Sequence, residues 1–403
     1  MGEYRNKRGT IGILTGGGDV PGLNPAIRAI TLRALDEGFQ VIGLRRGWLG
    51  LMELIRDKDA DNSNNYIVLT EDLVNKSGRT GGSFLHTSRT RPSHVPKDLV
   101  PIHLQSKYSK DINDLTSEVL KNLDYLGIDY LIPIGGDETL SYAVRMYQEG
   151  VKVIAIPKTM DNDVPGTDYC IGFSTCITRT INMVNTLRTT AGSHERILVV
   201  EVFGRYAGFT AMLPTLAGAA NRCVIPEVKF NIEKLTEILV SDRNRNPSKY
   251  SVLIVSEGAS MEGGPEIALP SKESESHVYE RGGSIGDIVA KGIRELSSKY
   301  NNGKTINVIE QSLGYLVRGG DPDSIDSIVP IAFGNLALDL ILKGIHGRMV
   351  ILRNGIYDNV PIDIVTSKRK TVDVAKYYNT EKYRPHYKSF EFQPMFFLTG
   401  SIS

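Results

Sequence analysis

The sequence predicts an α/β fold built from two doubly wound, mostly parallel sheets. Short apolar runs alternate along the chain with segments of helical periodicity, which is the pattern of repeated βα units. Polar, glycine-rich clusters follow five of the apolar runs, at the point where each predicted strand stops and a helix starts. That position is the ligand-binding edge of an open parallel sheet. The length of 403 residues is enough for two average domains.

The first βα unit begins with the predicted strand 10–15, which runs into three consecutive glycines at 16–18. Asn24 followed by Pro25 predicts a helix start with Asn24 as its cap, and strand 40–44 completes the unit. The glycines allow backbone N–H groups to approach an anion, although a tight turn is the commoner explanation of a lone glycine loop. Their spacing matches neither the dinucleotide motif nor the Walker loop, so a nicotinamide-dependent oxidoreductase is only weakly supported.

Later segments continue the alternation, with a polar and irregular stretch over 55–80 and a long polar loop over 259–284. We expect helices at 112–126, near 174–190, from about 231, at 285–300 and at 326–343, and strands at 129–134, 151–156, 197–202, 222–226, 251–256 and 304–310. The tail from Thr380 carries several aromatic residues without clear periodicity, so the sequence does not place it.

The chain is organised around the stretch Pro157–Asp163, directly after the predicted strand 151–156. Lys158 can neutralise phosphate, one of the carboxylates of Asp161 and Asp163 can hold a metal, and the other can accept a proton. Taken alone, the stretch is equally well explained as a solvated turn, because turns favour Asp and Asn.

Charged residues at the other strand ends fit the same chemistry. Asp137, with Asp161 or Asp163, could hold Mg²⁺ over phosphate oxygens. Glu257 could accept hydrogen bonds from sugar hydroxyls or could cap a helix. Four arginines near loop mouths suit phosphate recognition, although a surface ion pair explains each one singly; they are Arg89, Arg196, Arg205 and Arg318. Together these residues indicate phosphoryl transfer, with magnesium, a phosphate cradle, a general base and a second phosphate site.

Composition narrows the class of protein. A hydrophobic content of 41% and a charged content of 23% are ordinary for a globular enzyme, and the net charge of +1 gives no reason to expect nucleic acid or an anionic membrane. No apolar run approaches the roughly 20 residues of a membrane helix, and the polar N-terminus does not resemble a secretory signal. The three cysteines lack paired spacing and the seven histidines lack zinc-ligand spacing. We therefore expect a soluble, cytoplasmic protein without zinc or disulfides.

Five motifs, in this order, resemble those of the 6-phosphofructokinases, most closely the pyrophosphate-dependent type. They span about residues 10 to 345 and are Thr15–Asn24, Gly135–Asp137, Pro157–Asp163, Phe203–Arg205 and Arg318–Gly320. The resemblance implies that the active site lies between two lobes. It assigns 1–172 plus 317–403 to the lobe for the phosphoryl donor and 173–316 to the lobe for the sugar phosphate.

The resemblance also implies roles for individual residues. Asp161 is expected to be the base for the 1-hydroxyl of fructose 6-phosphate, with Asp137 and Asp163 near the metal, Mg²⁺. The other expected catalytic residues are Lys158, Glu138 and Arg205. The sugar phosphate is expected to contact Thr159, Asp161, Arg196, Phe203, Gly204, Arg205, Glu257, Tyr315 and Arg318, and the diphosphate Gly17, Gly18, Arg89 and Lys158. Arg196 is similar to an arginine that reaches in from a neighbouring subunit, which implies a homo-oligomer, a dimer or tetramer, with shared active sites.

Glu138 is the residue that bears most on the donor. ATP-using members resemble Gly-Gly-Asp-Gly, whereas Glu138 stands at the fourth position here and would repel an α-phosphate. Pyrophosphate-using members carry an acidic residue there, most often Asp, and Lys158 resembles the lysine that stabilises the transferring group of pyrophosphate. The implied reaction is reversible transfer from pyrophosphate to fructose 6-phosphate, giving fructose 1,6-bisphosphate and phosphate in glycolysis or gluconeogenesis.

The chain departs from the family pattern at two further places. Ile309 stands where many members have an arginine for the 6-phosphate, and Leu32 follows Arg28 where a second effector-site arginine would stand. We therefore expect one phosphate contact fewer and weak or absent nucleotide control. Two alternatives stay open, an ATP-dependent 6-phosphofructokinase and a non-catalytic sensor of sugar phosphates.

Overall fold

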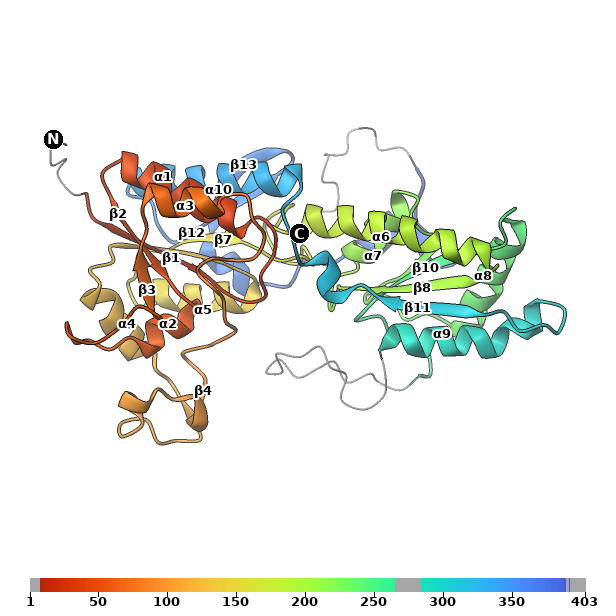
Figure 1. Cartoon of the computed structure of the whole chain (residues 1–403), viewed down its shortest axis with the longest axis horizontal. Coiled ribbons are helices and arrows are strands. Elements are labelled where there is room, and N and C mark those ends of the chain that lie inside the picture. Colours follow the sequence, from red (N-terminus) through yellow and green to blue (C-terminus); the bar gives the residue numbers. More distant parts are fainter. Residues whose placement is uncertain (1–7, 265–283, 389–390, 392–403) are drawn as a thin grey trace. The chain divides into compact units, whose positions relative to one another are not determined.

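The computed structural model describes residues 8–264, 284–388 and 391, and these residues form two compact units (Figure 1). The first unit holds the described residues up to Thr159 together with Val164–Gly172 and Gly319–Arg369. The second holds Met160–Asp163, Phe173–Arg318 and the described residues from Lys370 onward. Most of the predicted loop 259–284 lies outside the described residues.

The first unit is built on a seven-stranded sheet with the order β13-β12-β7-β6-β1-β2-β3. The five central strands are parallel, whereas the two edge strands, β3 and β13, run antiparallel to their neighbours. The strands are β1 (Thr10–Thr15), β2 (Gln40–Leu44), β3 (Tyr66–Val68), β6 (Tyr130–Gly135), β7 (Ile154–Pro157), β12 (Arg348–Arg353) and β13 (Ile356–Pro361). The predicted class, an α/β fold with mostly parallel sheets, is confirmed for this unit.

Helices cover both faces of this sheet (Figure 1). One face carries α1 (Leu23–Asp36), α3 (Glu71–Ser77) and α10 (Ser324–Leu342), which contact one another through α1. The opposite face carries α2 (Trp48–Glu53), α4 (Thr116–Tyr125) and α5 (Asp137–Gln148). Fully buried aliphatic residues of the central strands, such as Leu14, Leu131 and Ile351, form one core with these helices. The doubly wound arrangement leaves the carboxyl ends of the strands open to ligands.

The second unit is built on a four-stranded parallel sheet with the order β11-β8-β10-β9. Its strands are β8 (Ile197–Val202), β9 (Arg222–Val224), β10 (Ser251–Ser256) and β11 (Val308–Ser312). Two helices that contact each other, α6 (Phe173–Ser193) and α7 (Phe209–Leu216), lie on one side, and α8 (Ile232–Arg245) and α9 (Ile285–Leu296) lie on the other (Figure 1). A short helical turn, η4 (Gly314–Val317), follows β11. Two mostly parallel sheets were predicted, and the described residues contain two.

The C-terminal segment packs on the second unit, whereas we expected 317–403 to belong wholly to the first. The segment forms α11 (Val374–Tyr377) and the paired strands β14 (Tyr378–Asn379) and β15 (Arg384–Pro385). Tyr383 is buried in the core of the second unit, and its carbonyl accepts a hydrogen bond of 2.9 Å from the Cys223 N–H. These buried aromatic contacts fix the segment there, and they lack the periodicity by which sequence analysis places an element.

Asn24 does not cap α1, contrary to the prediction. The cap is Gly22, whose φ of 111° is left-handed and whose Cβ, if present, would lie 2.6 Å from the Ile171 side chain. Asn24 is buried inside the first turn, where its amide donates to the carbonyls of Thr80 and Gly81 and its side-chain oxygen accepts from the Phe84 N–H. Asn24 therefore ties the helix to the segment that follows α3.

Helix α10 contradicts the expectation that no apolar segment approaches the length of a membrane helix. It has 19 residues and a mean hydropathy of 1.7, and half of that window is buried inside the unit. Asp326 lies fully buried within it and accepts hydrogen bonds from the Tyr169 hydroxyl, at 2.5 Å, and from the Gly172 N–H, at 2.7 Å. A buried carboxylate paired in this way and the packing against α1 identify α10 as a core helix of the first unit.

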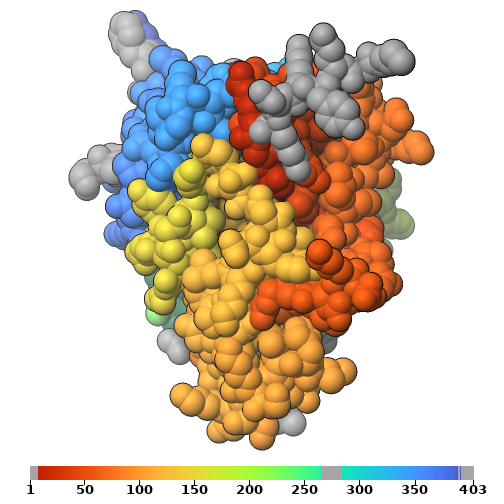
Figure 2. Space-filling model, turned by 90° about the vertical axis from the view of Figure 1, so that its left-hand side faces the viewer, coloured from red at the N-terminus to blue at the C-terminus, as the bar shows by residue number. Residues whose placement is uncertain are grey.

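The predicted irregular stretch over 55–80 contains two ordered elements, β3 and α3. Thr70 caps α3 by accepting the Leu73 N–H. A projection follows, formed by β4 (Val95–Pro96), β5 (Ile112–Asn113) and two 3₁₀ turns, and it occupies the lower end of the face in Figure 2. Residues 112 and 113, which we expected to start a helix, therefore belong to a strand, because Asn113 bonds back to Val95 and Lys110.

Glu118 of α4 anchors this projection. Its side chain is 2% exposed and its two oxygens pair with Arg56, at 2.7 Å, and with Lys107. Burial raises the pKa of this carboxyl, but the hydrogen bonds from Lys107 and Arg56 outweigh burial and lower the pKa to about 2. Because the pKa in the folded state lies below the ordinary value of 4.5, the charged pairing stabilises the fold above that value.

Glu118→Gln should lower the free energy of unfolding by about 1 to 3 kcal/mol at pH 7, because it removes the charged hydrogen bonds to Lys107 and Arg56. The difference from the wild type should shrink as the pH falls below about 4.5 toward 2, where the wild-type carboxylate also takes up a proton. Urea unfolding between pH 7 and pH 3 measures both effects. The exposed, mid-helix Glu237→Gln is the control, and a penalty independent of pH would contradict the prediction.

Candidate active site

The segment Pro157–Asp163 leaves β7 and is held by backbone pairing on both sides. The Lys158 N–H donates to the Gly135 carbonyl at 2.9 Å, and the Thr159 N–H donates to the Ile171 carbonyl at 3.2 Å. Burial then alternates along the segment, with Lys158, Met160 and Asn162 at most 3% exposed and Thr159, Asp161 and Asp163 partly exposed. Three side chains therefore fix the segment while the other three remain accessible.

Lys158 lies against the glycine loop that follows β1. Its Nζ donates to the Gly18 carbonyl at 2.7 Å, and a Cβ on Gly17 would lie 3.2 Å from the same nitrogen. A Cβ on Gly16 would lie 2.4 Å from Thr139 Oγ1 of α5. The glycines therefore permit close approach of the lysine and of the start of α5 to the loop.

Gly17 also joins the loop to the segment that carries Arg89. The Gly17 N–H donates to the Ser88 carbonyl at 2.8 Å, and the Thr87 hydroxyl donates to the Gly17 carbonyl at 2.6 Å. Arg89, the next residue, is thereby held beside the loop and is partly exposed. The Gly17 N–H is already hydrogen-bonded within the protein. A phosphate beside this loop would therefore be bound by the positive charges of Lys158 and Arg89.

Asp137 and Glu138 occupy the first turn of α5, directly after Gly136 at the cap. The positive end of the helix dipole favours carboxylates at this place. Asp137 pairs through Oδ2 with Arg369 and accepts a hydrogen bond of 3.3 Å through Oδ1 from Ser141. Sequence analysis missed Arg369, because it lies between recognisable elements and outside every motif.

Asp137 fits a magnesium site of the kind that uses few protein ligands. In the part of the chain that the structure describes, no three side chains of His, Cys, Asp or Glu gather as a metal cluster. Magnesium is commonly held by one or two carboxylates together with substrate phosphates and water. Asp137 is about one-third exposed, so it can supply one such carboxylate once Arg369 moves away.

Asp161 lies in the second unit among other acidic groups. Burial, the charge of Asp163 and the charge of Glu257 raise the pKa of Asp161 to about 8, against the opposing influence of the Arg205 N–H and the Arg318 guanidinium. A carboxylate with this pKa accepts a proton more readily than an ordinary aspartate does.

Arg205 and Glu257 meet because their strands are neighbours in register. Val202 at the end of β8 pairs with Ser256 at the end of β10, so the loops that follow start side by side. The Arg205 Nε lies 3.9 Å from Glu257 Oε1, and both side chains are largely buried. A Cβ on Gly258 would lie 1.9 Å from the Arg205 carbonyl oxygen, so glycine is required for this approach.

Arg318 packs on the aromatic residues that the sequence had grouped with it. Its guanidinium carbon lies 5.0 Å from the centroid of the Phe203 ring and 5.9 Å from that of the Tyr315 ring. Arg318 is 9% exposed, whereas Tyr315 is 59% exposed. The planar guanidinium is thereby oriented for bidentate contact with an anion.

Arg196 lies at the opposite end of β8 from this group. It directly precedes the six-residue strand, whereas Phe203 and Arg205 follow it, so roughly 20 Å separate the two ends. Among the described residues, the Arg196 Nε is buried without a hydrogen-bond partner. Within one chain, Arg196 therefore does not join the cluster of Arg205, Glu257 and Arg318.

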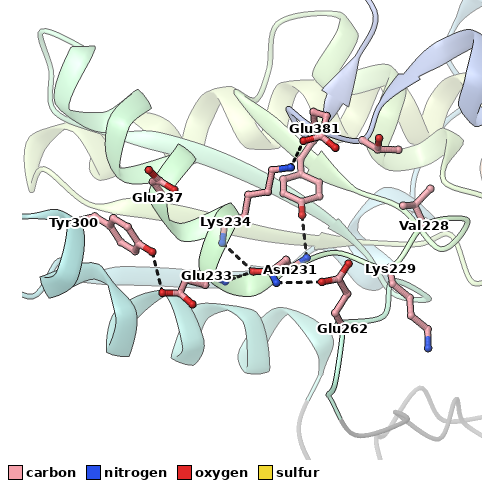
Figure 3. Close-up of a pocket in the computed structure, with 11 residues that line it drawn as sticks. Val228, Lys229, Asn231, Glu233, Lys234, Glu237, Glu262, Tyr300 and Glu381 are labelled. Atoms are coloured by element: carbon pink, nitrogen blue, oxygen red, sulfur yellow. Dashed lines mark hydrogen bonds and ion pairs between the residues drawn. The ribbon is translucent and has the colours of Figure 1, made fainter.

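A polar hollow of about 530 Å³ lies elsewhere on the second unit (Figure 3). It surrounds the start of α8, where Asn231 accepts the N–H groups of Glu233 and Lys234, and Lys234 pairs with Glu381. None of the predicted site residues lines this hollow.

Comparison with known proteins gives a family from sequence and a matching fold from solved structures. A family model described as phosphofructokinase matches residues 10–341. The chain is 36% identical to a pyrophosphate--fructose 6-phosphate 1-phosphotransferase of Dictyoglomus thermophilum, over 91% of this chain and 96% of that protein. It is 34% identical to an ATP-dependent 6-phosphofructokinase of Chloroflexus aurantiacus, over 89% of this chain and 91% of that protein. A crystal structure of a pyrophosphate-dependent phosphofructokinase from Marinobacter aquaeolei has the same fold, with a TM-score of 0.71, 18% identity and coverage of 97% of this chain and 92% of that one.

Proposed function

The chain belongs to the phosphofructokinase family, and we propose that it transfers a phosphoryl group from pyrophosphate to the 1-hydroxyl of fructose 6-phosphate. The products are fructose 1,6-bisphosphate and phosphate. The observation that supports this activity best is the grouping in the second unit of Asp161 with the sugar-binding candidates Arg205 and Glu257.

The second unit supplies the residues for the sugar phosphate. Asp161 takes the proton of the 1-hydroxyl as its oxygen attacks the terminal phosphorus of the donor, so the bond to the leaving phosphate breaks as the new P–O bond forms. Glu257 and the Phe203–Arg205 loop bind the sugar hydroxyls, and Thr159 contacts the substrate beside the base. Arg318 and Tyr315 bind the 6-phosphate, for which the stacked guanidinium is suited.

The first unit supplies the residues for the donor. Lys158 and Arg89 neutralise charge on the diphosphate, and the close approach of Lys158 to Gly18 sets its place. Asp137, together with Asp163, would hold Mg²⁺, which when bound neutralises the phosphate oxygens of the donor.

Pyrophosphate is favoured over ATP by Glu138. In the first turn of α5, a carboxylate both fills space and repels an α-phosphate, which ATP has and pyrophosphate lacks. Relatives with either donor in their names match this chain at similar identity, so the residues of the site carry this part of the proposal. A pyrophosphate donor also implies that the reaction runs in both directions.

The position of Arg196 supports a homo-oligomer with shared sites. Arg196 lies a whole strand away from Arg205 in its own chain, so we propose that it binds the 6-phosphate in the site of a second subunit. The unpartnered buried Nε supports a role that the single chain does not fulfil.

Asp161→Asn should lower kcat by about 10²- to 10⁴-fold with fructose 6-phosphate binding largely kept, because Asn has the same shape but cannot accept the proton. Steady-state kinetics and calorimetric titration of the sugar phosphate measure the two quantities. The exposed Asp124→Asn is the matched control. A fall of less than tenfold would remove Asp161 from the role of base.

The purified protein should turn over pyrophosphate faster than ATP, and Glu138→Gly should raise kcat/KM for ATP by roughly tenfold to a hundredfold. Glu138→Gln, which keeps the volume and removes the charge, separates filling of space from repulsion. Faster turnover with ATP in the wild type would reverse the donor assignment. No turnover with either donor would favour the non-catalytic sensor.

Co-expression of Asp161→Asn with Arg196→Ala should recover about a quarter of wild-type activity at low fructose 6-phosphate, although each variant alone is nearly inactive. In a mixed pair, one site combines the intact Asp161 of one subunit with the intact Arg196 of the other. Asp161→Asn with Arg205→Ala is the control, because each chain then carries a defect in its own site. Equal recovery in the two mixtures would contradict shared sites.

A further inference from the structure

Arg369 has no role in the proposed reaction, although it forms an ion pair with Asp137. Arg369 Nη2 contacts Asp137 Oδ2, and the two side chains are 31% and 32% exposed. Arg369 lies beyond residues 10–341, the part that the family model matches, so the family motifs give it no role. Its partner is the residue assigned to the metal.

The backbone on either side of Arg369 is held in place. The Ser367 N–H donates to the Ile364 carbonyl at 3.0 Å, and the Lys370 N–H donates to the Asp163 carbonyl at 3.1 Å. Lys370 is 7% exposed, and its Nζ lies 5.5 Å from the centroid of the Phe209 ring. The segment is thereby attached to the loop that carries Asp161 and Asp163, and the Arg369 side chain is partly exposed.

The Arg369 guanidinium already contacts Asp137 Oδ2, and its positive charge repels a metal cation at the same oxygen. The ion pair therefore competes with a metal for this carboxylate and weakens metal binding to the protein without donor. Once metal and pyrophosphate are bound together, the phosphate oxygens offer the displaced guanidinium a planar, bidentate anionic partner. Arg369 then opposes binding of the metal alone and favours binding of the metal with the donor.

We propose that Arg369 is a donor-binding residue that holds Asp137 in the ligand-free protein and exchanges this carboxylate for a phosphate of pyrophosphate when metal and donor bind. The identity of the donor in this proposal rests on the proposed function. The competition at Asp137 does not depend on the proposed function, because it involves only the protein and the metal.

Titration with Mn²⁺ as a paramagnetic probe, followed by electron paramagnetic resonance in the absence of substrate, tests the competition. Arg369→Gln should bind Mn²⁺ about threefold to tenfold more tightly than the wild type, the loss expected from one partly exposed ion pair. Asp137→Asn should weaken binding in either background. Arg353→Gln is the matched control, because Arg353 is a partly buried arginine of the same unit that donates to the Gly166 carbonyl. Unchanged Mn²⁺ affinity in Arg369→Gln would overturn the proposal.

Kinetics at saturating metal test the second part. Arg369→Gln should raise KM for pyrophosphate about tenfold or more with little change in KM for fructose 6-phosphate, whereas Arg369→Lys should keep part of the affinity. An unchanged KM for pyrophosphate would also overturn the proposal. If the wild type prefers ATP, the proposed donor fails, yet the Mn²⁺ titration still decides whether Arg369 competes for Asp137.

Discussion

The backbone pairing at the end of β7 is the constraint on which the candidate site depends. Pro157 has no N–H, so Lys158 makes the next hydrogen bond to Gly135, and Ile171 pairs on the other side. Pairing on both sides holds Lys158 and Thr159, and in the turn that follows Met160 and Asn162 are buried while Asp161 and Asp163 are partly exposed. Asn162 adopts a φ of 55°, a left-handed conformation that asparagine tolerates better than most residues. These backbone contacts and this conformation position Asp161, the residue that we propose as the base.

The acidic cluster around Asp161 is accompanied by an arginine because neighbouring parallel strands end at the same edge of the sheet. Neighbouring strands β8 and β10 finish at the same edge, which brings Glu257 toward Asp161 but also brings Arg205 with it. Burial and the neighbouring carboxylates raise the pKa of Asp161, and the Arg205 N–H and the Arg318 guanidinium oppose this rise without cancelling it. The glycines at 204 and 258 are part of this balance, since side chains at either position would push the two loops apart.

The strand ends were predicted well from the sequence, whereas the contacts between residues far apart in the chain were predicted poorly. Parallel strands are buried on both faces and appear as short apolar runs, and the polar cluster after each run marks its end, which is why Asp137, Lys158, Arg205 and Glu257 were found. Strands β12 and β13 were not predicted, and β13, the antiparallel edge strand, is largely exposed and has no apolar pattern. Asn24 was misassigned because a capping motif reports local preference, whereas the crowding at Gly22 comes from residues 171 and 326. No local sequence pattern marks Arg369 as a site residue, and its contact with Asp137 is seen in the structure.

Covalent connectivity limits the distance between Lys158, which we propose binds the donor, and Asp161, which we propose as the base for the acceptor. Lys158 belongs to the first unit and Asp161 to the second, yet only two residues, Thr159 and Met160, lie between them in the chain. An extended chain spans about 3.4 Å per residue, so their α-carbons are at most roughly 10 Å apart. Phosphoryl transfer requires the attacking and leaving oxygens to lie on opposite sides of one phosphorus, a separation well within that limit. The loop that carries Lys158 and Asp161, which we propose as a donor-binding residue and as the base, is therefore short enough for the proposed reaction, and the backbone pairing of Lys158 and Thr159 fixes the end of the loop from which Asp161 extends.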